Sequence, residues 1–268
     1  MARRASAWSL DGPNPGTLER GFWNLACDHY FRLETDGWHR LPDEPCLLIG
    51  VHSGGALTMD AWTLVFEWHR RFEGKRILHG TAHDVLMAAP GLGEYFRSNG
   101  VIPASRKGVT AALAAGHDVV VWPGGEQDSM RSWRKRDKAV LAGRHGFVKQ
   151  AMRSGVPIVP VATIGGHDTV FVLSEGRFLA RASGLGKLLR GATMPIVAGL
   201  PFGVGIELLP IHLPLPAKIR TELLDPIDVD AERIDDREYV HSIYLAVESA
   251  IQAGMDRLAR RRSFPVFG

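Results

Sequence analysis

The sequence has few cysteines and no long apolar run. Cys27 and Cys46 are the only two cysteines among 268 residues, which excludes a disulfide scaffold and a cysteine-rich zinc module. No uninterrupted apolar stretch reaches about 18 residues, so we expect no helix that spans a membrane. The residues that follow Met1 to Arg4 are mixed and polar, so we expect no secretory signal.

The sequence also has little excess charge of either sign. It carries 32 lysines and arginines against 29 acidic residues, a net charge of +3, which is too weak to predict a nucleic-acid partner. The basic residues gather in two runs, at 131–138 and 257–262. Such runs are typical of solvated surfaces and helix C-termini, or of a surface attracted to an anionic membrane.

The remaining composition is that of a globular enzyme-sized domain. Hydrophobic residues make up 45% and charged residues 23% of the chain, which excludes general disorder. A chain of this length suits a single α/β domain with a substantial core. We expect residues 1–16 to form a tail and residues 17–268 to form the domain.

Short apolar runs alternate with longer amphipathic segments through the middle of the chain. Expected strands are 46–51, 75–79, 101–103, 118–122 and 156–162. Expected helices are 56–72, 108–115, 137–153 and 84–97, the last one bent or broken at Pro90-Gly91. This alternation predicts a mainly parallel central sheet flanked by helices. Helical periodicity adds an N-terminal amphipathic helix over 17–30 and a C-terminal one along 239–255.

Polar and glycine-rich residues follow several expected strands, where ligands gather in parallel sheets. His52 follows the first buried strand, and a histidine there can act as a general base. Asp60 is the candidate that orients its ring. Arg106 follows a second strand and suits a phosphate or carboxylate. Gly124 and Gly125 follow a third, where backbone N–H groups can form an anion or oxyanion site.

These segments resemble the glycerolipid acyltransferase superfamily of the lysophosphatidate acyltransferase type. The family's first block is a strand followed by Asn-His-x-Ser-x-x-Asp, and its third is a strand followed by Pro-Glu-Gly-Thr-Arg. The four matching segments stand in the family's order at 49–60, 100–106, 119–126 and 155–161. The stretch Gly143 to Phe147 is similar to the branch that holds the mono- and diacylglycerol acyltransferases.

The resemblance implies a membrane-associated acyltransferase of phospholipid and lipid metabolism. It would move a fatty acyl group from acyl-CoA, or another acyl thioester, to a glycerolipid or lysophospholipid hydroxyl. His52 would be the general base and Asp60 its orienting acid. The residues expected around the substrates are Ser53, Arg106, Gly124, Gly125 and Glu126. We expect acyl-CoA as a co-substrate, with no other cofactor and no metal.

The spacing of the first block departs from the family's pattern. Seven residues separate His52 from Asp60, where the family has four. The three extra residues either add nearly one turn to the following helix, or lie in a loop around Gly54 and Gly55. If Asp60 does not face the histidine, Asp84 is an alternative acid.

The third block departs as well. Gly124 stands in place of the family's Glu, and Glu126-Gln127 in place of its Thr-Arg. A cationic phosphate ligand is therefore missing from this block. This favours a neutral glyceride or another alcohol over lysophosphatidate as the acceptor.

Two other functions remain open on the sequence alone. The segment from Val51 to Gly55 nearly matches the Gly-x-Ser-x-Gly elbow of serine hydrolases, with Ser53 as nucleophile and Asp168 with His212 completing a triad. The β-branched Val51 at the strained turn counts against this esterase alternative. The irregular spacing between histidine and aspartate also leaves open a non-catalytic lipid-binding protein.

One nearly uncharged stretch of the sequence indicates where in the cell the protein could be located. Between Arg190 and Lys218 the only charged residue is Glu207, and frequent prolines there exclude a spanning helix. The stretch is either an irregular core segment or a surface that dips into a bilayer. Together with the arginines at 257–262, it leads us to expect peripheral binding to the anionic cytoplasmic face of the cell membrane.

Overall fold

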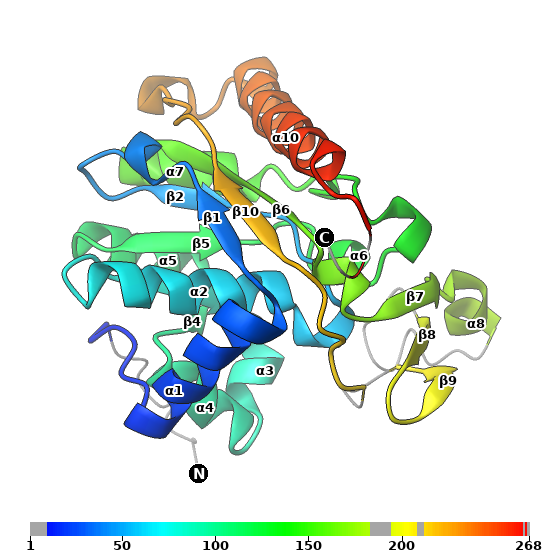
Figure 1. The fold of residues 1–268 in the computed structure, drawn as a ribbon. Coiled ribbons are helices and arrows are strands. Elements are labelled where there is room, and N and C mark those ends of the chain that lie inside the picture. Colours follow the sequence, from blue (N-terminus) through cyan, green and yellow to red (C-terminus); the bar gives the residue numbers. More distant parts are fainter. Residues whose placement is uncertain (1–9, 183–193, 208–211, 265, 267–268) are drawn as a thin grey trace, which may run out of the picture.

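The computed structural model describes residues 10–182, 194–207, 212–264 and 266, and its centre is a seven-stranded sheet (Figure 1). In sheet order the strands are β1 (Glu34–Asp36), β10 (Arg220–Leu223), β6 (Ile158–Ile164), β2 (Leu47–Ile49), β5 (Asp118–Val121), β3 (Leu78–Ala82) and β4 (Ile102–Pro103). Strand β10 runs antiparallel to β6, and every other neighbouring pair is parallel.

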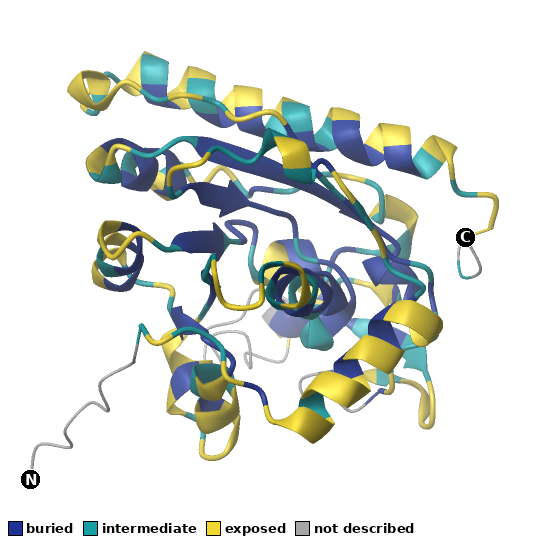
Figure 2. Cartoon of the chain, turned by 60° about the vertical axis from the view of Figure 1, so that its left-hand side comes forward, coloured by how far each residue is buried: buried dark blue, intermediate teal, exposed yellow. Residues whose placement is uncertain are grey.

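Helices cover both faces of this sheet because its central strands are apolar on both sides. Leu48 of β2 packs in one cluster with α2 (Met59–Phe72). Leu47 and Ile49 point to the opposite face, as alternation along a strand requires. That face is covered by α5 (Arg106–Ala114), α7 (Gly146–Ser154) and the long α10 (Arg237–Arg260). Figure 2 shows the buried residues of α10 on the side that faces the sheet.

Shorter elements surround this core. Helix α1 (Thr17–Leu25) continues as a π-helical turn (Ala26–Tyr30), and Trp23 of α1 stacks on Phe66 of α2. The other helices are α3 (Asp84–Ala88), α4 (Leu92–Ser98), α6 (Glu126–Ser129) and α8 (Arg177–Ala182). Short 3₁₀ turns occur at Trp38–Arg40, Gly55–Leu57, Trp133–Lys135, Gly166–Asp168 and Ala231–Arg233.

A second, antiparallel sheet lies beside the main one at the right of Figure 1. It consists of β7 (Phe171–Ser174), β8 (Ile196–Gly199) and β9 (Gly203–Ile206). Strands β8 and β9 belong to the nearly uncharged stretch, whose residues 191–193 and 208–211 lie outside the described residues. None of the described helices combines the length and the apolar character that crossing a bilayer requires.

The structure corrects several boundaries. The helix expected over 137–153 begins only at Gly146, because Ala142 and Gly143 adopt positive φ angles of 55° and 66°. The strand expected at 75–79 lies at 78–82. Part of the expected N-terminal tail is attached to the body, since the Asn14 N–H donates to the Ser98 carbonyl at 2.9 Å.

Candidate active site

The parallel strands end along one edge of the sheet, and the expected site residues follow them there. His52 comes after β2, and Gly124 and Gly125 come after the adjacent β5. Arg106 is the first residue of α5, after β4, and is exposed. Since β4 lies three strands from β2, the ends of these two strands are about 14 Å apart along the edge. The structure therefore brings the first and third blocks together and places the second farther away.

His52 faces the buried carboxylate of Asp60. The ring Nδ1 lies 3.4 Å from Asp60 Oδ2, and Asp60 Oδ1 accepts the backbone N–H of Ser53 at 2.7 Å. Asp60 lies in the first turn of α2, where the helix dipole favours a negative charge. With Nδ1 toward the acid, Nε2 is the nitrogen left to exchange a proton with a substrate.

A loop accommodates the extra residues of the first block. Residues Gly55–Leu57 form a 3₁₀ turn, and α2 begins at Met59. The φ angles of Gly54, Gly55 and Thr58 are 93°, 66° and 43°, a left-handed conformation that glycine adopts readily. This turn returns Asp60 to the histidine, so the loop alternative is correct. Asp84 is exposed at the start of α3, and Asp60 is the acid that faces His52.

An aromatic side chain supports the ring of His52. The indole of Trp122 stacks on the imidazole with centroids 4.7 Å apart and an interplanar angle of 8°. Gly50 makes room for this indole, because a Cβ there would lie 2.9 Å from Trp122 Nε1. The His52 side chain keeps 18% of its surface exposed, so a substrate can reach it.

A buried ion pair beneath the histidine was not predicted. Asp128 and Arg131 form a close ion pair, and both side chains are almost fully buried. The Asp128 carboxylate accepts the backbone N–H of His52, and Arg131 Nη1 donates to the His52 carbonyl at 2.7 Å. Arg131 is thus not part of a solvated basic run. The i,i+3 spacing of acid and arginine was the available sequence signal.

Burial governs the protonation of the groups around this pair. Desolvation raises the pKa of Asp128 well above its ordinary value, while the charge of Arg131 opposes that shift. His167 follows β6 and is also fully buried. Desolvation, helped by the charge of Arg131, holds the pKa of His167 well below 6.5. A hydrogen bond with the backbone of Asp128 opposes this lowering of the pKa.

The geometry does not assemble the serine hydrolase triad. Ser53 is buried, and a Cβ on Gly166 would lie 2.0 Å from its hydroxyl oxygen. Asp168 instead accepts Trp133 Nε1 at 2.8 Å. His212 Nδ1 lies 2.7 Å from Glu207 Oε2. The three expected triad members therefore serve other contacts.

The turn after β5 is tightly packed. The Gly125 N–H donates to the Trp122 carbonyl at 3.2 Å, so that amide already has an acceptor. A Cβ on Gly124 would lie 2.4 Å from Asp128 Cβ, which requires glycine there. Glu126 is exposed at the start of α6. The guanidinium of Arg144 donates to the Pro123 carbonyl at 2.8 Å, which places a cation beside this turn.

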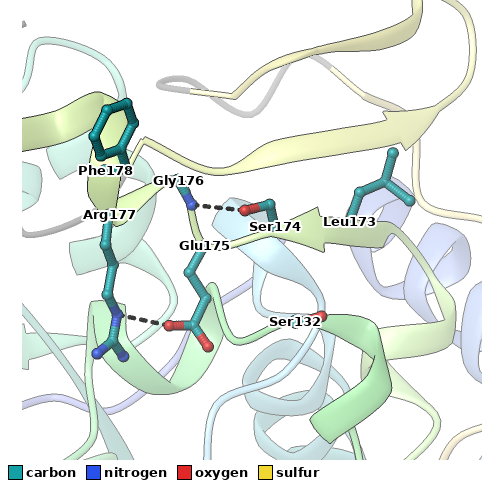
Figure 3. A pocket seen from close by; sticks show the side chains of 7 residues that line it. All are labelled: Ser132, Leu173, Ser174, Glu175, Gly176, Arg177 and Phe178. Carbon is teal, nitrogen blue, oxygen red and sulfur yellow. Dashed lines mark hydrogen bonds and ion pairs between the residues drawn. The ribbon is translucent and has the colours of Figure 1, made fainter. Parts of the chain in front are cut away.

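A separate hollow of about 380 Å³ lies between β7 and α8 (Figure 3). Its lining residues are Ser132, Leu173, Ser174, Glu175, Gly176, Arg177 and Phe178. Arg177 Nε pairs with Glu175 Oε2 at 2.6 Å inside it. None of these residues belongs to the histidine site, and Phe178 is 81% exposed.

Sequence comparison supports the resemblance of the blocks. The profile of a family described as diacylglycerol acyltransferase matches residues 19–250. An uncharacterized protein of Mycobacterium tuberculosis is 28% identical over 242 residues, covering 89% of this chain and 65% of the relative. Human diacylglycerol O-acyltransferase 2 is 29% identical over 147 residues, covering 52% and 37%. This chain thus spans less than two thirds of the length of either relative.

Structure comparison confirms the predicted fold class. The crystal structure of a 1-acyl-sn-glycerophosphate acyltransferase from Thermotoga maritima superimposes with a TM-score of 0.54 and 17% sequence identity. The match covers 91% of this chain and 80% of that one. The two proteins share a single α/β domain with a mostly parallel sheet flanked by helices.

Proposed function

The chain belongs to the diacylglycerol acyltransferase family, and from this membership we propose that it transfers a fatty acyl group to a glycerolipid or lysophospholipid hydroxyl. The proposed donor is acyl-CoA or another acyl thioester. The observation that carries the proposal is the pairing of His52 Nδ1 with buried Asp60 at the carboxyl end of β2. This arrangement supports a general base beside a substrate at the sheet edge.

The proposed reaction forms a C–O bond and breaks the C–S bond of the thioester. His52 Nε2 takes the proton of the acceptor hydroxyl while the oxygen attacks the thioester carbonyl. Asp60 stabilises the imidazolium and holds the ring orientation. Collapse of the tetrahedral intermediate releases the thiolate, which receives the proton from His52. The chain needs no acyl-enzyme for these steps.

A neutral acceptor fits the surroundings of the base best. The third block supplies no solvent-facing cation, and the acid and arginine that follow it, Asp128 and Arg131, are buried. Arg144 is the exposed cation beside the turn after β5, and Arg106 lies farther along the same edge. We propose these two arginines for a phosphate of the donor, and mono- or diacylglycerol as the acceptor class.

Exposed apolar side chains support peripheral binding to the cytoplasmic face of the cell membrane. One group, which we name the apolar patch, lies on the second sheet and the segments next to it: Leu173, Phe178, Leu200, Phe202, Val204, Ile206 and Leu213. Other exposed apolar side chains lie on α1, at Leu18, Phe22 and Leu25, and on α3 and α4, at Val85, Leu86 and Leu92. The C-terminal arginines contribute less than the sequence suggested. Arg262 is nearly buried and pairs with Asp137, and Arg257 pairs with Glu222.

An acyl-transfer assay tests the proposal. Radiolabelled acyl-CoA is offered with lysophosphatidate, other lysophospholipids, monoacylglycerol and diacylglycerol in turn. We expect label in the esterified product of a neutral glyceride. Hydrolysis of acyl-CoA without transfer to any lipid would support the esterase alternative. Binding of lipid without turnover would support a non-catalytic protein.

A further inference from the structure

The peptide unit of His52 is held from both sides by one ion pair. The Asp128 carboxylate accepts the His52 N–H, and Arg131 donates to the His52 carbonyl at 2.7 Å. The mechanism proposed above uses only the ring of His52 and Asp60. The pair therefore acts on the backbone of the base without contacting the reacting atoms.

The surroundings of the pair fix it in place. Arg131 also donates to the carbonyls of Lys135 and Arg136, at 3.1 and 3.0 Å. Gly124 lies so close to Asp128 that no larger residue fits between the turn and the carboxylate. A buried ion pair contributes little net stability, because desolvation cancels most of its attraction. We therefore look for the role of this pair in its two contacts with the backbone of His52 and not in its contribution to stability.

The position of the His52 backbone matters because the distance between the base and its acid cannot increase much before the contact is lost. His52 Nδ1 and Asp60 Oδ2 are 3.4 Å apart, near the upper limit for a hydrogen bond. A small shift of the His52 backbone would separate them or lift the ring from Trp122. Misplacing a catalytic group by about 1 Å can lower a rate roughly 100-fold.

We propose that Asp128 and Arg131 are positioning residues that set the backbone of His52 for general-base catalysis. The inference rests on the proposed function, and it gives the residues that follow the third sequence block a role in holding the base. It also gives a reason for the glycine at position 124, which leaves room for Asp128.

An ion pair at the opposite end of β5 provides a matched control. Asp118, at the start of β5, accepts the backbone N–H of Cys46 at 2.9 Å and pairs with Arg76 at 2.6 Å. Asp118 is as buried as Asp128. Asp118 therefore holds the residue before β2 in the way that Asp128 holds a residue after it. The histidine lies after β2, at the end that Asp128 holds, and not at the end that Asp118 holds.

The experiment compares Asp128→Asn with Asp118→Asn. We expect Asp128→Asn to lower kcat roughly 10- to 100-fold with the KM of both substrates nearly unchanged. The acidic limb of its pH–rate profile should move to lower pH, because Arg131 is left uncompensated near His52. Asp118→Asn should keep kcat within about twofold of the wild-type value and should not move the acidic limb of the pH–rate profile, even if the variant is less stable. Equal kcat losses in the two variants would overturn the proposal.

Two additions keep the test decisive. If Asp128→Asn does not fold, the double variant with Arg131→Gln removes the unpaired buried charge, and it should fold and remain slow. An NMR titration of the His52 ring needs no turnover. Asp128→Asn should change its pKa or tautomer and Asp118→Asn should not, and an unchanged ring in both variants would refute the positioning role. If the wild-type protein has no acyl-transfer activity but Asp128→Asn still changes the pKa or tautomer of the His52 ring, only the proposed function would be refuted.

Discussion

His52 and Ser53 are adjacent in the sequence, but we expect their replacement to have very different effects on acyl transfer. His52→Ala should lower turnover roughly 10²- to 10⁴-fold, because it removes the proposed general base. Ser53→Ala should cost far less, since the serine hydroxyl is buried against Gly166. Acyl-transfer rates of both folded variants measure this difference. An inactive Ser53→Ala variant, or labelling of Ser53 by a fluorophosphonate, would favour the esterase.

Asp60 is predicted to matter through the orientation of the imidazole. Asp60→Asn keeps the size of the side chain and can still accept the Ser53 N–H, so the fold should survive. The amide favours the wrong tautomer of His52 and cannot stabilise its charged form, so kcat should fall roughly 100-fold or more. Circular dichroism and steady-state rates test the two halves of this prediction. Nearly normal activity would mean that no His–Asp dyad operates.

His167 makes folding stability depend on pH. Its folded-state pKa lies well below 6.5 because of burial, so the unfolded chain binds a proton that the folded chain does not. Stability therefore falls as the pH drops below about 6.5, by roughly 1.4 kcal/mol per pH unit. His167→Leu should stabilise the protein more at pH 5.5 than at pH 7.5. Urea unfolding at both values measures this, and an equal gain at both would contradict the assignment.

At the scale of elements, the loop between β2 and α2 decides where Asp60 lies. Gly54→Ala introduces strain at φ 93° and places a Cβ 3.0 Å from the Gly166 carbonyl, so Asp60 should move away from the histidine. Gly74→Ala introduces a similar strain at φ 81° with open space around it. Both should lose about 1 kcal/mol of stability. Only Gly54→Ala should lose most of its activity, and equal activities would show that the loop does not set the dyad.

The helices and strands also differ in how well the sequence predicts them. Strands β2 and β5 were predictable because burial on both faces makes them continuous apolar runs. Strand β10 was not, since its sequence Arg-Thr-Glu-Leu is polar and its place depends on pairing with distant β6. His52 and Asp60 follow from one block of sequence. The Asp128–Arg131 pair has an i,i+3 spacing, but the sequence does not show that it contacts His52, which follows a different strand.

At the scale of the whole molecule, the apolar patch should determine binding to lipid. Replacing Phe202 and Leu213 with Glu puts charge on two exposed positions and should abolish most sedimentation with anionic vesicles. Leu245→Glu is the matched control, because Leu245 is 46% exposed on α10, away from this sheet. The part of binding that remains in the patch variant should disappear in high salt. Loss of binding in the control, or none in the patch variant, would refute the role of the patch.

The order β1–β10–β6 also has a consequence for biosynthesis. Strand β1 is made early and β10 late, yet β10 pairs with both β1 and β6. While the chain emerges from the ribosome, the fully buried residues of β6 therefore have an unpaired backbone edge until residues 220–223 have been synthesised. An exposed apolar strand edge is a template for intermolecular pairing. We therefore expect the nascent chain to be prone to intermolecular pairing between the completion of β6 at residue 164 and that of β10 at residue 223, whereas β3 and β4 are made one after the other.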